Sequence, residues 1–143
     1  MEALAQDDTW GHSLPQIESN KIFRILLQNP RGLKLIHDPV GTHYSLSISV
    51  SLSVGAICLP ETNVNWGHKD TQQSLQNLIR KTWQHSTFSS SYTNQQGGTL
   101  TIINDNWTSR ITSKGTDPFG MGRWSYMHLR GQGGKTILLV TAY

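Results

Sequence analysis

The chain has 143 residues, a net charge of +3 and one cysteine, so it forms at most one ordinary domain without an internal disulfide. Hydrophobic residues make up 36%, and the six histidines show no spacing typical of a zinc site. The first ten residues have no basic and apolar leader, and no apolar run is long enough to span a membrane. We therefore expect an intracellular protein, nuclear or cytoplasmic and not secreted.

Charge is divided unevenly along the chain. Residues 1–60 hold four Lys/Arg and five Asp/Glu, a net charge of −1, whereas residues 61–143 hold eight and four, a net charge of +4. A basic second half suits a polyanion such as the backbone of a nucleic acid. A solvated basic face explains so small an excess equally well, so charge alone does not identify a partner.

The first predicted element follows a polar stretch. Residues 1–20 have no apolar period, and we expect a flexible lead there. The next run, KIFRILLQN at residues 21–29, is typical of a central strand that ends near Asn29. Pro30 and Gly32 follow, and proline is tolerated there because it no longer has to donate a hydrogen bond to a neighbouring strand.

Residues 44–54 carry two conflicting signals. In YSLSISVSLSV, apolar residues alternate strictly with serine, and this period predicts a half-buried strand. Wound as a helix, the same residues place their apolar side chains on nearly opposite sides, which makes a poor amphipathic helix. A strand would nevertheless run into the next predicted strand, residues 54–59, with only Gly55 as a turn residue. The pattern alone favours a strand.

The second half of the chain alternates between clear elements and polar segments. Apolar residues at helical spacing predict a helix over residues 71–84, and Asp70 and Gln73 have the spacing of a capping box. Residues 86–98 are predicted to be a polar loop. Three strands are predicted from the runs GTLTIIND, RWSYMHLR and KTILLVTAY, with a hairpin at residues 130–134 between the last two.

The last predicted strand is apolar nearly throughout. Such a run favours a central strand that is buried on both faces. The chain stops at Tyr143, the final residue of that strand. Because a central strand needs neighbours on both sides, we expect the chain to be the front half of a larger domain.

Three predicted strands end in or next to a polar residue, namely Asn29, Glu61 and Tyr143. An isolated glutamate is more often a surface carboxylate or a cap. A carboxylate with amide and phenol neighbours at strand ends is instead typical of a site at the edge of a sheet. Oxygen ligands of this kind suit Mg²⁺. Cys58 lies inside an apolar run and is predicted to be a core residue.

Taken in order, these segments resemble the front half of the endonuclease/exonuclease/phosphatase superfamily. The similarity covers about residues 21–143 and is greatest to endonuclease-like domains found beside reverse transcriptases and in retroelement-type reading frames. It rests on the motifs NPRGL, VGAICLPETNVNW, GGTLTIIND, GRWSYMHLR and TILLVTAY.

The resemblance implies an α/β fold, namely an incomplete four-layer α/β/β/α sandwich with two sheets face to face and helices outside. It implies hydrolysis of phosphodiesters with Mg²⁺ or Mn²⁺. Glu61 would bind the metal, Asn29 would order the site and Tyr143 would contact the phosphate. The resemblance also replaces the strand at residues 44–53 by a helix, because the family has a helix between its first two strands.

In the family, the Asp-x-Asn and Asp–His pairs that provide the base and the acid follow the tyrosine strand, and this sequence ends before them. We therefore expect an endonuclease fragment that acts on nucleic acid, with DNA favoured over RNA, and that is inactive alone. Its expected partners are nucleic acid and either a missing C-terminal half or an adjacent reverse transcriptase, and no membrane.

Two other interpretations remain open at this point. One is a non-catalytic basic fragment that binds nucleic acid or another partner. The other is a product without function, whose exposed sheet edges would make it aggregate. Salt dependence separates the first from a metal-dependent site, because binding to a phosphate backbone weakens steeply with salt and does not need a metal.

Overall fold

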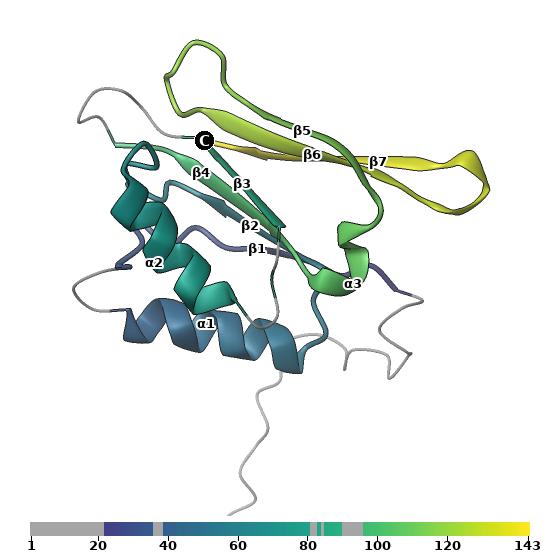
Figure 1. The fold of residues 1–143 in the computed structure, drawn as a ribbon, viewed down its shortest axis with the longest axis horizontal. Coiled ribbons are helices and arrows are strands. Elements are labelled where there is room, and N and C mark those ends of the chain that lie inside the picture. Colours follow the sequence, from purple (N-terminus) through teal and green to yellow (C-terminus); the bar gives the residue numbers. More distant parts are fainter. Residues whose placement is uncertain (1–21, 36–38, 81–82, 84, 90–95) are drawn as a thin grey trace, which may run out of the picture.

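The computed structural model describes residues 22–35, 39–80, 83, 85–89 and 96–143. The predicted lead over residues 1–20 lies outside them. The described residues form two sheets, one with strand order β1-β2-β4-β3 and one with order β5-β6-β7 (Figure 1). The strands are β1 (Ile25–Leu27), β2 (Ala56–Pro60), β3 (His85–Ser89), β4 (Thr99–Ile103), β5 (Ile111–Thr116), β6 (Trp124–Arg130) and β7 (Thr136–Ala142). The expected mixed α/β fold with two sheets is confirmed.

Helices α1 (Val40–Ser51) and α2 (Lys69–Ile79) cover one face of the four-stranded sheet (Figure 1). The core beneath them contains Trp66 and Trp83, each 1% exposed, together with leucine and isoleucine side chains of β2, β4 and α2. Every second residue of β2 and β4 faces this core, because side chains alternate between the two faces of a strand. The predicted strand at residues 54–59 and the predicted helix at residues 71–84 are both present, with shifted ends.

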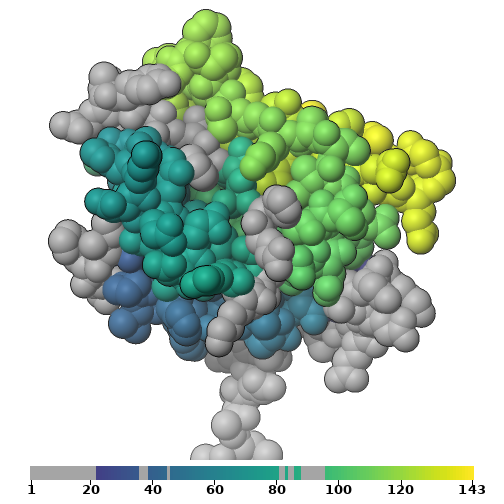
Figure 2. Space-filling model, viewed as in Figure 1, coloured from purple at the N-terminus to yellow at the C-terminus, as the bar shows by residue number. Residues whose placement is uncertain are grey.

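The other face of the four-stranded sheet packs on the second sheet. Ala56, Ile103 and Met127 are fully buried in this interface. Buried hydroxyls also bond across it: Thr101 Oγ1 and Thr141 Oγ1 share a hydrogen bond of 2.6 Å. The described residues thus stack as a helical layer and two sheets. The fourth layer that the resemblance implies is not among them. The β6–β7 hairpin, yellow in Figure 2, projects from the body.

Two strands predicted to be central lie at sheet edges instead. β1 pairs only with β2, and β7 only with β6, among the described strands. On β7, Thr141 is buried against the first sheet, but Leu138 and Val140 are 62% and 49% exposed on the opposite face. An apolar run shows that a strand is hydrophobic, but it does not show how many strands pair with it or whether both of its faces are covered. The predicted hairpin between β6 and β7 is confirmed.

Residues 44–51 belong to helix α1, so the strand favoured by their period was wrong and the helix implied by the resemblance is confirmed. Serine tolerates this helix because its hydroxyl can bond to a carbonyl one turn earlier. Ser47 Oγ donates to the His43 carbonyl at 2.9 Å, and Ser51 Oγ donates to the Ile48 carbonyl at 2.7 Å. The side chains of α1 that pack inward include Leu46 and Ser49.

Two further sequence predictions were wrong, and one strand was missed. Part of the predicted polar loop at residues 86–98 forms strand β3, and β5 was not predicted at all. Both strands are rich in serine and threonine, which lack a hydrophobic signal even though Ser86 and Thr87 are buried. The capping box is also absent: α2 begins after His68, which makes no side-chain cap, and Gln73 Nε2 donates to Asn77 Oδ1 instead.

Cys58 is a core residue, as predicted, and faces the second sheet. Burial raises the pKa of its thiol, and a hydrogen bond with Thr141 acts in the opposite direction. The thiol is therefore held in its protonated form.

We expect the free energy of unfolding to fall as the pH rises above about 8.5, the pKa of an exposed thiol. In that range the unfolded chain loses the Cys58 proton while the folded chain keeps it, whereas below that pH both states are protonated. Urea unfolding at about pH 7 and about pH 9.5 measures the loss. It should be larger in the wild type than in Cys58→Ala, and equal losses would contradict a buried thiol.

The exposed face and edge of β7 predict self-association of the chain, because unpaired strand edges with apolar side chains pair with other chains. Leu138→Lys should reduce aggregation, measured by light scattering during concentration, and change stability by less than about 0.5 kcal/mol because the side chain is exposed. Gln76→Lys, which adds the same charge on the exposed side of α2 and away from any strand edge, is the control. An equal benefit from both variants would assign the effect to net charge alone.

Candidate active site

The structure brings Asn29 and Glu61 into direct contact. β1 and β2 run parallel, with Leu27 opposite Cys58, so the residues that follow the two strands emerge at the same edge of the sheet. Asn29 Nδ2 donates a hydrogen bond of 2.8 Å to Glu61 Oε2. Glu61 is half-buried and Asn29 is exposed. Two of the three predicted site residues therefore form one polar pair.

The loop after β1 holds the Asn29 amide in one orientation. Asn29 Oδ1 accepts a hydrogen bond of 2.9 Å from the Arg31 backbone N–H, which closes a turn. Gly32 N–H then donates to the Glu61 carbonyl at 3.0 Å and ties the two loops together. Since the amide oxygen is used within the turn, the NH₂ group faces Glu61. Asn29 can thus orient the carboxylate of Glu61.

The backbone at this edge is strained. Arg31, Glu61 and Asn63 have φ values of 48°, 55° and 51°, in the left-handed region that non-glycine residues rarely adopt. Each such residue costs of order 1–3 kcal/mol and persists only when its surroundings hold it in place. The hydrogen bonds between the two loops provide that support. Strain of this kind is concentrated in segments whose geometry serves a function.

Tyr143, at the end of β7, reaches the same end of the molecule through Gly97. Its backbone N–H donates to the Arg123 carbonyl at 2.8 Å, and its ring lies so close to Gly97 that a Cβ there would be 3.3 Å from two ring carbons. Gly97 is joined to Asn63 by two hydrogen bonds, of 2.7 and 2.8 Å. The third predicted residue, Tyr143, is therefore linked to the Glu61 loop through Gly97 and Asn63.

Two residues that support this end of the sheets were not predicted from the sequence. Asn63 connects the Glu61 loop to Gly97 through its side chain. Asp117 is 7% exposed, and its carboxylate accepts hydrogen bonds from the backbone N–H groups of Phe119, at 2.9 Å, and Arg123, at 3.2 Å. The signal for Asp117 was the Asp-Pro-x-Gly sequence, which is typical of a turn held by the aspartate side chain.

The oxygen groups at this edge fit a single-carboxylate Mg²⁺ site. Within the part of the chain that the structure describes, no three His, Cys, Asp or Glu side chains are close enough to hold a metal ion together. Glu61 thus offers one carboxylate, with Asn29 bonded to one of its oxygens. Mg²⁺ is often bound by one or two carboxylates while it keeps several waters. A cage made only of protein ligands does not fit these residues.

No known family model matches the chain, and no curated protein matches it significantly. Among the described residues, none of the helices has the length and apolar character needed to cross a bilayer. The assignment of a function therefore depends on the geometry of the site and on the resemblance of the sequence motifs.

Gly97→Ala should shift the Tyr143 ring and destabilise the fold by about 1–3 kcal/mol, because Gly97 has a φ of 139° and its Cβ would lie only 3.3 Å from two carbons of that ring. Urea unfolding measures the cost. Gly133→Ala, at a positive φ but with nothing within 4 Å, is the control for backbone strain alone. If the ring contact matters, Gly97→Ala will cost less in a Tyr143→Ala background. Equal costs in both backgrounds would show that Tyr143 is not seated on Gly97.

Proposed function

We propose that this chain carries the metal-binding edge of a Mg²⁺- or Mn²⁺-dependent phosphodiesterase that cleaves nucleic acid, DNA in preference to RNA. The observation that carries the proposal is the hydrogen bond between Asn29 Nδ2 and Glu61 Oε2 at the ends of two parallel strands. On this proposal the fold is the front part of the four-layer α/β/β/α sandwich of the endonuclease/exonuclease/phosphatase superfamily, of the retroelement type. The exposed outer face of the β5-β6-β7 sheet is where the further layer would lie.

Each residue has a role that follows from its bonds. Glu61 would bind the cation through its carboxylate, and water would fill the other positions. Asn29 fixes the direction of that carboxylate by donating to Oε2. Tyr143 is 56% exposed, so its phenol is available to donate a hydrogen bond to a phosphate oxygen. When bound, the metal supplies Lewis acidity at a phosphoryl oxygen.

Binding of metal and phosphate does not complete the reaction. A general base and a general acid each contribute about 10²–10⁴-fold in rate. Among the described residues, no group of three or more His, Cys, Asp or Glu side chains surrounds a metal-sized space with Glu61. The base and acid would have to come from elsewhere, such as a complementary half of the domain. The 143-residue chain alone is expected to bind Mn²⁺ or Mg²⁺ and to show little or no turnover.

Glu61→Gln should weaken binding of Mn²⁺ by at least about tenfold, because it removes the carboxylate that is proposed to bind the metal. Electron paramagnetic resonance of free Mn²⁺ measures the affinity. Asn29→Ala should weaken binding by about 10–100-fold, since partners that orient a ligand typically have effects of this size. Asp105→Asn removes an exposed carboxylate in α3 (Asp105–Thr108) and is the control. Unchanged affinity in Glu61→Gln would refute the metal site. Strong nuclease activity of the wild-type chain would refute the statement that it lacks a general base and a general acid.

A non-catalytic module that binds nucleic acid is the second candidate. It is favoured by the net charge of +4 over residues 61–143, which contain eight Lys/Arg and four Asp/Glu. The exposed cations Arg31 and Arg123 at the candidate site also favour it. Binding to a short DNA at rising salt separates the two candidates. A pure backbone contact weakens steeply with salt and ignores Mg²⁺, whereas the proposed site requires Mg²⁺ and Glu61.

A further inference from the structure

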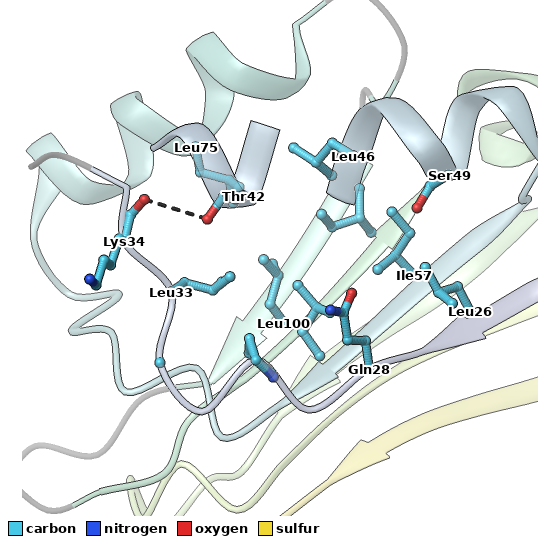
Figure 3. A pocket seen from close by; sticks show the side chains of 15 residues that line it. Leu26, Gln28, Leu33, Lys34, Thr42, Leu46, Ser49, Ile57, Leu75 and Leu100 are labelled. Atoms are coloured by element: carbon cyan, nitrogen blue, oxygen red, sulfur yellow. Dashed lines mark hydrogen bonds between the residues drawn. The ribbon is translucent and has the colours of Figure 1, made fainter. Parts of the chain in front are cut away.

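A cavity of about 350 Å³ lies between α1, the helix-covered face of the four-stranded sheet and the loop at residues 28–34 (Figure 3). Its wall is largely apolar and is formed by Leu26, Leu33, Leu46, Ile57, Leu75 and Leu100. Protein interiors contain few voids larger than a water molecule. This cavity is partly open to solvent, and the side chains that face it determine its size.

Helix α1 forms part of the cavity wall. The helix turns small polar residues toward the sheet, since Ser49 is fully buried and Thr42 is half-buried, and both line the cavity. Leu46 is buried, but other bulky residues of the helix face outward, with Val40 72% and Tyr44 67% exposed. An amphipathic helix ordinarily buries its large apolar side chains against the sheet. In α1 a small residue, Ser49, lines the cavity at a buried position instead.

The polar groups on the wall are uncharged. Lys34 lines the cavity, but Figure 3 shows its ammonium group pointing away, while its carbonyl accepts a hydrogen bond of 3.4 Å from Thr42 Oγ1. The Thr42 hydroxyl still has lone pairs with which to accept a second bond. The Gln28 amide lies on the exposed side of the cavity. A charged ligand would lose its hydration here without meeting an opposite charge.

We propose that this cavity binds a small, uncharged, largely apolar molecule that carries one hydroxyl group. Small-molecule pockets have volumes of about 300–1,000 Å³, mostly apolar walls and a few polar groups that fix the orientation of the ligand. The apolar body of the ligand packs between Leu46 and Leu100, and its hydroxyl donates to Thr42 Oγ1 or bonds to the Gln28 amide. This site is separate from the pair formed by Asn29 and Glu61 and does not depend on the phosphodiesterase proposal.

Binding of a ligand in this cavity would also restrain the loop that carries Asn29. Gln28, Pro30 and Gly32 line the cavity, and they alternate along the chain with Asn29 and Arg31. A ligand that packs on this wall restrains the loop. The amide hydrogens of Gly32 and Leu33, which donate to the Glu61 and Thr62 carbonyls, should then exchange more slowly with solvent. Hydrogen exchange at these amides locates the bound molecule without any assay of activity.

Naphthol, naphthalene and naphthalenesulfonate are suitable probes, because they share one apolar body and differ in the polar group. We expect saturable binding of naphthol by calorimetry and slower exchange at Gly32 and Leu33. Naphthalene should bind at least about fivefold more weakly, which corresponds to one lost hydrogen bond. Naphthalenesulfonate should not bind at the cavity. Failure of naphthol to bind, or equal binding of naphthalenesulfonate, would overturn the proposal.

Ser49→Leu fills the cavity from within and should reduce the affinity for naphthol at least tenfold. Ser47→Leu places the same side chain two residues away, on the exposed side of α1, and should leave binding unchanged. Because Ser49→Leu can disturb folding, Thr42→Leu is a second cavity-filling variant, and circular dichroism of the aromatic residues checks the fold of each. Equal binding by wild type and a folded cavity-filling variant would place the ligand elsewhere and overturn the proposal.

Discussion

Strand β2 is the element on which the rest of the structure depends. It pairs in parallel with β1 and antiparallel with β4, and four of its five residues are buried. Ile57 and Leu59 face the helices, whereas Ala56 and Cys58 face the second sheet. β2 therefore contacts the helical layer on one face, the second sheet on the other face, and a neighbouring strand along each edge. These contacts together fix the position of its end. Glu61 follows that end directly, and its location is therefore as well defined as the core itself.

The edge of the sheets combines this rigidity with strained backbone. The chain leaves β2 through residues with positive φ at Glu61 and Asn63, and hydrogen bonds to the neighbouring loops hold them there. A relaxed turn would direct the carboxylate elsewhere, so the strain and the contact with Asn29 belong to one arrangement. The support combines backbone bonds between loops, the bond from Gly97 N–H to Asn63 Oδ1, and the buried Trp66, whose Nε1 donates to Thr62 Oγ1 at 3.2 Å. Backbone and side-chain hydrogen bonds together therefore order this edge.

The helical layer is less well packed than the sheet beneath it. Helix α2 buries Leu75 and Ile79, as an amphipathic helix should, but α1 presents Ser49 to the sheet and leaves Tyr44 exposed. The cavity lies under α1 and is lined by Ser49, and the loop at residues 28–34 forms part of its wall. The same loop carries Asn29. The cavity under α1 and the hydrogen-bonded pair of Asn29 and Glu61 are thus next to each other in the structure. Apolar side chains line the first, whereas hydrogen bonds hold the second.

The sequence by itself determined the elements whose hydrophobic signal is strong and local: β2, β4, β6, β7, the hairpin before β7 and most of α2. It also marked Asn29 and Glu61, because polar residues directly after apolar strands are visible without a structure. Tertiary structure decided the rest. The helix over the serine-rich segment, strands β3 and β5, and the edge positions of β1 and β7 depend on neighbours that are distant in the chain. The contact between Asn29 and Glu61, 32 residues apart, likewise exists only because β1 and β2 pair in parallel. The pattern of residues in a segment shows which of its side chains can be buried. Strand pairing in the folded sheet determines which distant residues those side chains contact.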